Sequence, residues 1–300
     1  MDLLDSWSRH LRAKNRSQST IDSYRADVMH LVDHLSGKVE LEDVTARQIE
    51  DFLAASLDRG LAPATVARRY RSLQQLYRWL VVEGEVDANP MANMDAPTVP
   101  VQPPDVLTGA EITALLDACR DRTGAGNNGR SGPFEARRDT AMVLLLVTTG
   151  IRASELIGLT VDDIHFNVET FRVLGKGGRE RSVTLLPQPA EALDRYLRAR
   201  RKHAERSSPA LWLGEKGPLT DSGLRQMLER RSASAGIRRV NPHLFRHTFA
   251  HLAKKRGMAD EQLMAIAGWN TTQMLQRYGA SATAERAREA HRTLFGDDRL

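Results

Sequence analysis

Residues 241–278, NPHLFRHTFAHLAKKRGMADEQLMAIAGWNTTQMLQRY, carry the pattern from which the rest of the chain is interpreted. The opening Asn-Pro pair is typical of a helix start, because Asn caps a free N–H group and Pro is tolerated at the first helical position. His243, Arg246 and His247 then follow at i, i+3 and i+4, so they share one face of the predicted helix near its N-terminus. Since the unpaired N–H groups and the macrodipole at a helix N-terminus attract anions, we predict a phosphate-binding site here.

Two aromatic residues follow in the same stretch. Trp269 comes directly after a glycine, and Tyr278 lies in a short amphipathic segment. Tyr278 carries a phenol that can reach the same phosphate site.

The composition indicates a cytoplasmic protein with a polyanionic partner. The 300 residues suffice for one large or two ordinary domains, and the net charge is +5. Residues 1–96 hold 12 Lys and Arg against 15 Asp and Glu, whereas residues 97–300 hold 31 against 23. A basic C-terminal part favours a polyanion, although a charged surface is more often simply solvated. The single cysteine, Cys119, fits a reducing compartment, and the sequence shows neither a membrane span nor a signal peptide.

The hydrophobic spacing of residues 1–96 predicts an all-helical domain. Its last predicted helix, about 63–83, begins at a proline and ends before a glycine. On this helix Arg68, Arg71 and Arg78 fall within an arc of about 80°, at 100° per residue, and the apolar residues from Val66 to Val81 occupy the other side. A four-helix bundle with such an arginine stripe suits a nucleic-acid backbone, with an ordinary solvated face as the alternative.

A proline-rich stretch up to Pro104 predicts an extended linker after the helical domain. Beyond it, Thr108 and Glu111 have the spacing of a capping box at the start of another helix. Residues 122–132 are glycine-rich and polar, and they predict a loop without chemistry of its own.

Residues 149–156, TGIRASEL, place an arginine at a helix entry directly after a glycine turn. Arg152 is well placed there to bind phosphate oxygens with its planar fork of N–H groups. Glu155, one turn later, can orient that guanidinium. The alternative is a common surface pair of Arg and Glu at i and i+3.

Residues 164–186 contain the one convincing β region. Two short strands flank GKGGRER, residues 175–181, which predicts a hairpin turn rich in cations. The glycines let the turn approach another backbone closely, so that Lys176 projects as a mobile ammonium, and Arg179 and Arg181 are candidates for DNA contact. A solvated turn lysine is an equally good reading of Lys176 when the turn is considered alone.

These pieces, taken in order, resemble the tyrosine recombinases, the family of phage integrases and Xer-type site-specific recombinases. TGIRASEL resembles the family's first-arginine motif, GKGGRERSVTL (175–185) its hairpin lysine, HLFRHTFAHL (243–252) its His-x-x-Arg box, and AGWNTTQMLQRY (267–278) its nucleophile segment. Each motif is modest alone, but the four in this order are highly specific, and the match covers nearly the whole chain.

The resemblance implies a mainly α fold with a small β-sheet. It implies a helical, SAM-like core-binding domain that contacts DNA (residues 1–96), a linker (97–106) and a mixed α/β catalytic domain (107–300). The last predicted helix, 283–294, would dock on a neighbouring subunit.

The resemblance also implies a role for each matched residue. Tyr278 would attack the scissile phosphate and form a 3′-phosphotyrosine. Arg152 and Arg246 would bind the non-bridging oxygens, His243 would assist by hydrogen bonding or proton transfer, and Lys176 would protonate the leaving 5′-oxygen. Glu155 matches the acidic position that organises the site.

Position 269 departs from the commonest family pattern. Many members carry histidine there, and a minority, including Cre-like enzymes, carry tryptophan. The indole N–H of Trp269 can donate to a phosphate oxygen, but it cannot shuttle a proton. We therefore expect this position to support transition-state binding without acid–base chemistry.

We expect the reaction to need no metal, no ATP and no other cofactor. A covalent tyrosyl ester retains the bond energy for rejoining, and two arginines supply the electrostatic stabilisation that Mg²⁺ gives elsewhere. A metalloenzyme that uses His243, His247 and His251 is a poor alternative, because the HExxH glutamate is missing.

The resemblance implies double-stranded DNA with a short inverted-repeat core site as the partner, bound by a homotetramer on two duplexes. The lack of an extra N-terminal arm-binding domain favours a simple short site, and Trp269 leans slightly towards a mobile element. Two alternatives are a DNA-binding regulator without catalysis and a nicking-closing enzyme of the type IB topoisomerase kind.

Overall fold

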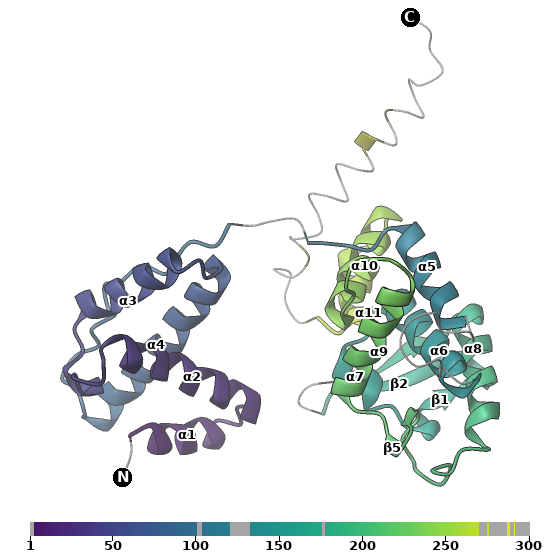
Figure 1. Cartoon of the computed structure of the whole chain (residues 1–300), viewed down its shortest axis with the longest axis horizontal. Helices are drawn as coiled ribbons and strands as arrows, with labels where there is room; N and C mark the ends of the chain where they lie inside the picture. The colour runs from purple at the N-terminus through teal and green to yellow at the C-terminus, as the bar shows by residue number, and fades with distance from the viewer. Residues whose placement is uncertain are drawn as a thin grey trace, which may run out of the picture. The chain divides into compact units, whose positions relative to one another are not determined.

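The computed structural model describes residues 3–100, 104–120, 133–175 and 178–269, together with residues 275, 287, 288 and 291. The chain divides into two compact units, Met1–Val101 and Gln102–Leu300 (Figure 1). Among the described residues, no helix is both long and apolar enough to cross a membrane.

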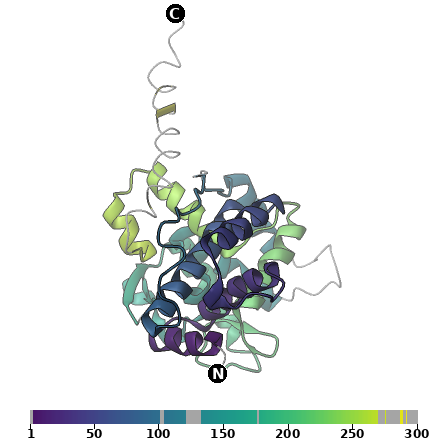
Figure 2. The same ribbon diagram turned by 90° about the vertical axis from the view of Figure 1, so that its left-hand side faces the viewer.

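The N-terminal unit, drawn in purple and blue in Figure 2, is built from helices around one apolar core. They are α1 (Leu3–Ala13), α2 (Gln18–His34), the 3₁₀ turn η1 (Leu41–Asp43), α3 (Ala46–Asp58) and α4 (Pro63–Glu83). Local signals set their ends. Ser17 caps α2, a Thr45–Gln48 capping box starts α3, and Gly84 ends α4 in the left-handed conformation. Trp7, Phe52 and Tyr77 are among the large side chains that fill the core.

Helix α4 presents the predicted arginine face to solvent. Arg71 and Arg78 are exposed, whereas Arg68 is half-buried and donates to the buried Asp27 carboxylate at 2.7 Å. The opposite side of the helix faces the core, as predicted, with one exception. Val81 is 37% exposed, because it lies in the last turn of α4, beyond the end of the buried stripe.

The C-terminal unit is mainly helical with two small sheets. Its elements are α5 (Gly109–Arg120), α6 (Pro133–Thr149), α7 (Ala153–Ile157), η2 (Val161–Asp163), β1 (Ile164–His165), η3 (Phe166–Val168), β2 (Thr170–Leu174), β3 (Glu180–Thr184), α8 (Pro187–Arg200), β4 (Leu213–Gly214), β5 (Gly217–Pro218), α9 (Asp221–Ser234), α10 (Pro242–Lys255) and α11 (Asp260–Ala267). Helix α6 is largely apolar and packs against α5, α8 and α10 (Figure 1). The fold class predicted from the sequence, mainly α with a small β-sheet, is confirmed.

The larger sheet is the predicted hairpin with one short strand added. Its order is β1-β2-β3, all antiparallel, and Phe171 pairs with Val183 in the β2–β3 register. Both of these side chains are buried, so one face of the sheet joins the core. The pair β4–β5 was not predicted, because strands of two residues are too short to show an alternating pattern.

Two further features concern α8 and the core. Helix α8 ends at Arg200, whose guanidinium binds backbone carbonyls of the irregular segment that follows it. In the core, Asp139 accepts hydrogen bonds from both Arg138 and Arg231, which compensates the buried charges. Cys119 is fully buried in the same core, and burial raises the pKa of its thiol to about 12.

Candidate active site

Helix α10 places Arg246 inside the C-terminal unit. The helix starts as predicted, because the Asn241 side chain accepts hydrogen bonds from the backbone N–H groups of His243 and Leu244, both at 3.0 Å. One turn later, Arg246 is 3% exposed and donates to the carbonyl oxygens of Gly150 at 2.9 Å and Ala267 at 2.7 Å. Its guanidinium carbon lies 4.9 Å from the centre of the Trp269 ring, which adds a cation–π contact.

Arg152 reaches the same backbone from a different element. It stands at the start of α7, and its side chain is 40% exposed. The guanidinium donates to Glu155 Oε1 at 2.6 Å and to the carbonyl oxygen of Gly268 at 2.8 Å. Arg152 and Arg246 therefore bind consecutive carbonyl groups, those of residues 268 and 267, and lie close together at the C-terminal end of α11.

Glu155 joins Arg152 to a third arginine. The Glu155 carboxylate is 3% exposed, and Arg181 binds it with two hydrogen bonds of 3.0 and 2.8 Å. Burial alone would raise the pKa of Glu155, but the hydrogen bonds from Arg181 and from the Arg152 backbone N–H outweigh it and lower the pKa to about 2. The carboxylate is therefore ionised throughout the physiological pH range.

Two glycines permit this close packing. Gly150 has φ +59°, and a Cβ atom there would lie 2.6 Å from the Phe249 ring. Gly268 has φ +64°, and a Cβ atom there would lie 2.9 Å from Nη1 of Arg181. Both positions require glycine for the backbone conformation as well as for space.

Two of the three histidines of α10, His243 and His247, lie in its N-terminal half. His243 is exposed, and its ring meets the His247 ring edge-on with centroids 4.3 Å apart. Among the residues that the structure describes, no group of three or more His, Cys, Asp and Glu side chains is arranged to hold a metal ion. This applies to the set of His243, His247 and His251 that the metalloenzyme alternative used.

Two predicted site residues, Lys176 and Tyr278, lie outside the described residues, as does most of the predicted last helix, 283–294. Arg179 is exposed at the end of the hairpin turn, as a DNA contact would require. The structure brings Arg152, Glu155, Arg246 and Trp269 together around Gly268.

The position of Arg181 differs from the prediction that it contacts DNA. Its side chain is only 14% exposed, and besides binding Glu155 it donates to the carbonyl oxygen of Ile266 at 3.0 Å. Strand β3 explains this placement, because alternate residues of a strand share a face and Arg181 lies on the same face as the buried Val183. That alternation was visible in the sequence and could have indicated an inward-facing arginine.

A second interaction that sequence reasoning missed involves Arg238. Its guanidinium donates to Asp105, to the carbonyl of Val106 and to Glu111, so the loop before α10 holds the segment that leads into α5. Arg238 and Glu111 are 127 positions apart in the sequence, so no local pattern predicts the contact.

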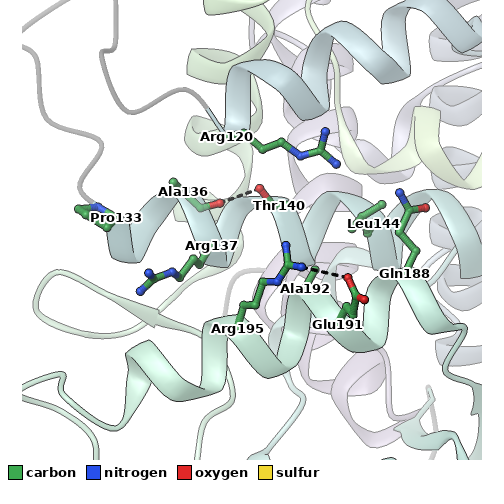
Figure 3. A pocket seen from close by; sticks show the side chains of 10 residues that line it. All are labelled: Arg120, Pro133, Ala136, Arg137, Thr140, Leu144, Gln188, Glu191, Ala192 and Arg195. Carbon is green, nitrogen blue, oxygen red and sulfur yellow. Dashed lines mark hydrogen bonds and ion pairs between the residues drawn. The ribbon is translucent and has the colours of Figure 1, made fainter.

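A surface depression of about 360 Å³ is lined by residues of α5, α6 and α8 and of their ends (Figure 3). Arg120, Arg137 and Arg195 surround an apolar floor that includes Leu144 and Ala192. Glu191 pairs with Arg195 at 3.1 Å, and Asp117 pairs with Arg120 at 3.3 Å, so part of the positive charge is compensated. None of the predicted site residues that the structure describes lines this depression.

Comparison with known proteins identifies the family. The phage integrase family model matches residues 105–285, and the model of the phage integrase N-terminal SAM-like domain matches residues 4–84. Tyrosine recombinase XerD of Corynebacterium glutamicum is 32% identical over 96% of this chain and 97% of its own length. Tyrosine recombinase XerC of Corynebacterium efficiens is 30% identical over 92% of this chain and 86% of its own.

Solved structures show the same fold. The XerH site-specific recombinase in a post-cleavage complex with palindromic difH substrate has a TM-score of 0.75, with 20% identity over 96% of this chain and 83% of its own. A lambda integrase tetramer bound to a Holliday junction has a TM-score of 0.66, with 20% identity over 90% of this chain and 76% of its own. The chain therefore belongs to the phage integrase family and is a tyrosine recombinase, an enzyme of site-specific recombination.

Proposed function

We propose that the protein cuts and rejoins double-stranded DNA through a covalent 3′-phosphotyrosine intermediate on Tyr278. One observation carries this proposal. Arg246 and Arg152 bind the consecutive carbonyls of Ala267 and Gly268, eleven and ten positions before Tyr278. Two guanidinium groups are thus held close together, at the start of the segment that carries the candidate nucleophile.

In the proposed reaction, the Tyr278 phenol loses its proton to water and its oxygen forms a bond to the scissile phosphorus, while the bond from that phosphorus to the 5′-oxygen breaks. Arg152 and Arg246 stabilise the charge on the non-bridging oxygens, and Lys176 donates a proton to the departing 5′-oxygen. We assign His243 to hydrogen bonding or proton transfer, and Trp269 to transition-state binding without proton transfer. Rejoining is the reverse attack by a 5′-hydroxyl on the tyrosyl ester.

We propose that the reaction proceeds without metal or ATP. The two arginines supply positive charge at the phosphate, and the ester bond conserves the energy needed for rejoining. Covalent adduct formation in the presence of a chelator would test this, because a metal-dependent enzyme would form no adduct there.

We propose a short inverted-repeat DNA site, bound by four protomers on two duplexes in the cytoplasm. The XerH and lambda integrase structures are DNA complexes, and one of them is a tetramer, which supports an assembly of this kind. In this proposal residues 1–96 form the core-binding domain, with the Arg68, Arg71 and Arg78 face of α4 and the hairpin Arg179 on the DNA backbone. Residues 107–300 form the catalytic domain, and residues 97–106 link the two.

The decisive experiment is covalent capture on a nicked suicide substrate that carries the inverted repeat flanking the gene. We expect the wild-type protein to form a 3′-linked adduct and Tyr278→Phe to form none while it still binds DNA. An adduct that survives this substitution would overturn the assignment of the nucleophile. Binding without any adduct would favour a regulator, and relaxation of DNA of any sequence without recombinants would favour a topoisomerase-like enzyme.

A further inference from the structure

We propose that Arg181 is a positioning residue, which fixes Arg152 and the start of the nucleophile segment and does not contact DNA. This inference rests on the proposed function. It replaces the prediction that Arg181 belongs with Arg179 on a DNA-contacting turn.

Arg152 and Arg181 share the carboxylate of Glu155. Glu155 Oε1 accepts hydrogen bonds from both Arg152 at 2.6 Å and Arg181 at 3.0 Å, and Arg181 also binds Oε2 at 2.8 Å. A bidentate pair of guanidinium and carboxylate restricts the orientation of both planar groups. Arg181 thereby sets the plane of the carboxylate, and the carboxylate in turn holds the half-exposed Arg152.

Arg181 also contacts the C-terminal end of α11. The last carbonyls of a helix lack partners within the helix, and here three consecutive ones each accept a hydrogen bond from a different arginine. Ile266 accepts from Arg181 at 3.0 Å, and the next two carbonyls accept from Arg246 at 2.7 Å and Arg152 at 2.8 Å. These carbonyls lead directly into Trp269, so the arginines hold the backbone at residues 266–268, where the segment that carries Tyr278 begins.

Arg181 packs tightly against Gly268. The guanidinium of Arg181 lies against the Cα atom of Gly268, since a Cβ atom there would be 2.9 Å from Nη1 and 3.0 Å from Cζ. Gly268 also has a positive φ and closes α11 in the left-handed conformation. The packing of Arg181 and the turn at Gly268 therefore depend on each other.

Arg181 is itself part of the β2–β3 hairpin. Arg181 lies in β3, five positions after Lys176, and the base of the turn is closed by a hydrogen bond of 2.7 Å from the Gly175 N–H to the Arg179 carbonyl. Arg181 thus anchors the hairpin that carries the proposed proton donor, so it connects this hairpin with Arg152 and with α11. A lysine carries all its N–H donors on one nitrogen and lacks the planar fork. It therefore cannot bind both Glu155 oxygens in this bidentate way and also reach the Ile266 carbonyl.

The test uses Arg181→Gln and Arg181→Lys in the full chain, with Arg225→Gln as the matched control. The control removes the same charge at an exposed side chain that pairs with Asp221 on its own helix. We measure the DNA dissociation constant and the rate of covalent adduct formation at saturating DNA. Arg181→Gln should lower the saturated rate about 100-fold, the scale expected for a misplaced reacting group, with DNA affinity within about twofold of wild type.

The remaining variants should follow the same logic. Arg181→Lys should recover little of the rate, whereas Arg225→Gln should keep both the DNA affinity and the saturated rate of the wild type. Gly268→Ala retains Arg181 but displaces it, so it should reproduce the fall in rate. Weaker DNA binding with an unchanged saturated rate in Arg181→Gln would overturn the proposal.

A 5′-bridging phosphorothiolate substrate adds a readout that a purely structural role would not move, because its leaving group needs no acid. Lys176→Ala should be rescued by it. Arg181→Gln should be rescued only in part, since Arg152 is misplaced as well as Lys176. Complete rescue of Arg181→Gln would overturn the link to Arg152.

Failure of the wild type to form an adduct would count against the proposed function instead. A double-mutant cycle between Glu155→Gln and Arg181→Gln in urea unfolding would then still test the interaction between these two side chains, and additive effects would overturn it.

Discussion

The charge of Glu155 matters at the scale of single residues because this carboxylate lies between two guanidinium groups. It is buried, yet its pKa is about 2, so the hydrogen bonds from Arg181 and Arg152 more than offset the cost of burial. The folded protein therefore stabilises the ionised form of the Glu155 carboxyl group much more than its protonated form. Removing this charge leaves two arginines without their shared partner.

We predict that Glu155→Gln destabilises the protein by about 3 kcal/mol at neutral pH, the order set by lowering a pKa from 4.5 to about 2. Because the folded pKa is lowered, this stabilisation is fully present above about pH 4.5 and disappears as the pH falls towards 2. Urea unfolding of both proteins should show a constant difference above about pH 5 that narrows in acid. A difference that stays constant down to about pH 3 would contradict the prediction.

A second prediction concerns Gly150. We expect Gly150→Ala to destabilise the protein by about 2 kcal/mol or more, because a strained left-handed alanine is combined with a clash on the Phe249 ring. Gly236→Ala is the matched control, since Gly236 has φ +66° and nothing lies within 4 Å of its added Cβ. The control should cost about 1 kcal/mol in urea unfolding, and equal costs would remove the steric argument.

At the scale of elements, α4 and the β2–β3 hairpin offer positive charge in different ways. In α4, Arg71 and Arg78 are exposed, and Asp27 holds the half-buried Arg68 through a hydrogen bond. In the hairpin, Arg179 is exposed, whereas Arg181 turns inward. Only the exposed side chains are available to a DNA backbone.

We predict that a variant in which Arg68, Arg71 and Arg78 are all replaced by glutamine shows a weaker salt dependence of DNA binding. The slope should fall by about one unit for each phosphate that these side chains no longer neutralise. The control replaces Arg195, Arg198 and Arg225 on α8 and α9, which are exposed and pair with acidic neighbours on their own helices. An unchanged slope in the α4 variant would remove that face from the interface.

The elements were predictable wherever a local signal defines them. Pro63 and Gly84 bound α4, and the Thr108–Glu111 capping box starts α5, because these signals lie close to the helix ends in the sequence. The proximity of distant positions was accessible only through the family resemblance, which assigns Arg152 and Arg246 to one phosphate. The contact of Arg152 with the Gly268 carbonyl, 116 positions away, was not predicted. The inward side chain of Arg181 needed the strand alternation to be weighed against the charge of the turn.

Buried polar pairs were the hardest features to predict. Asp27 is fully buried in α2, and its partners Arg68 and Ser72 are 41 and 45 positions away. No periodicity distinguishes such an aspartate from a solvated one. The same holds for Arg238, which follows α9 in the chain but binds Asp105 and Glu111 at the start of α5.

At the scale of the whole molecule, the two parts of the chain differ in charge. Residues 1–96 carry a small acidic excess and residues 97–300 a basic one. The predicted arginine face of α4 is thus a local feature of an acidic unit, whereas the proposed catalytic part is basic on balance. Long-range attraction to DNA should therefore come mainly from residues 97–300.

We predict that removing residues 283–300 impairs synapsis of two DNA sites while cleavage of a single site continues. The reason is the proposed docking of this segment on a neighbouring protomer. Native gel analysis of paired sites, with the suicide-substrate adduct as the control for cleavage, would measure both. Complete recombination by the shortened protein would dismiss the docking proposal.

The burial of Cys119 gives the molecule a built-in reporter. Its thiol is inaccessible in the folded core and its pKa is raised to about 12, so a maleimide or disulfide reagent should react only when the C-terminal unit opens. Because the chain has one cysteine, the kinetics of labelling would follow a single site without any engineered mutation. Comparing labelling with and without bound DNA would then show how strongly the duplex suppresses that opening.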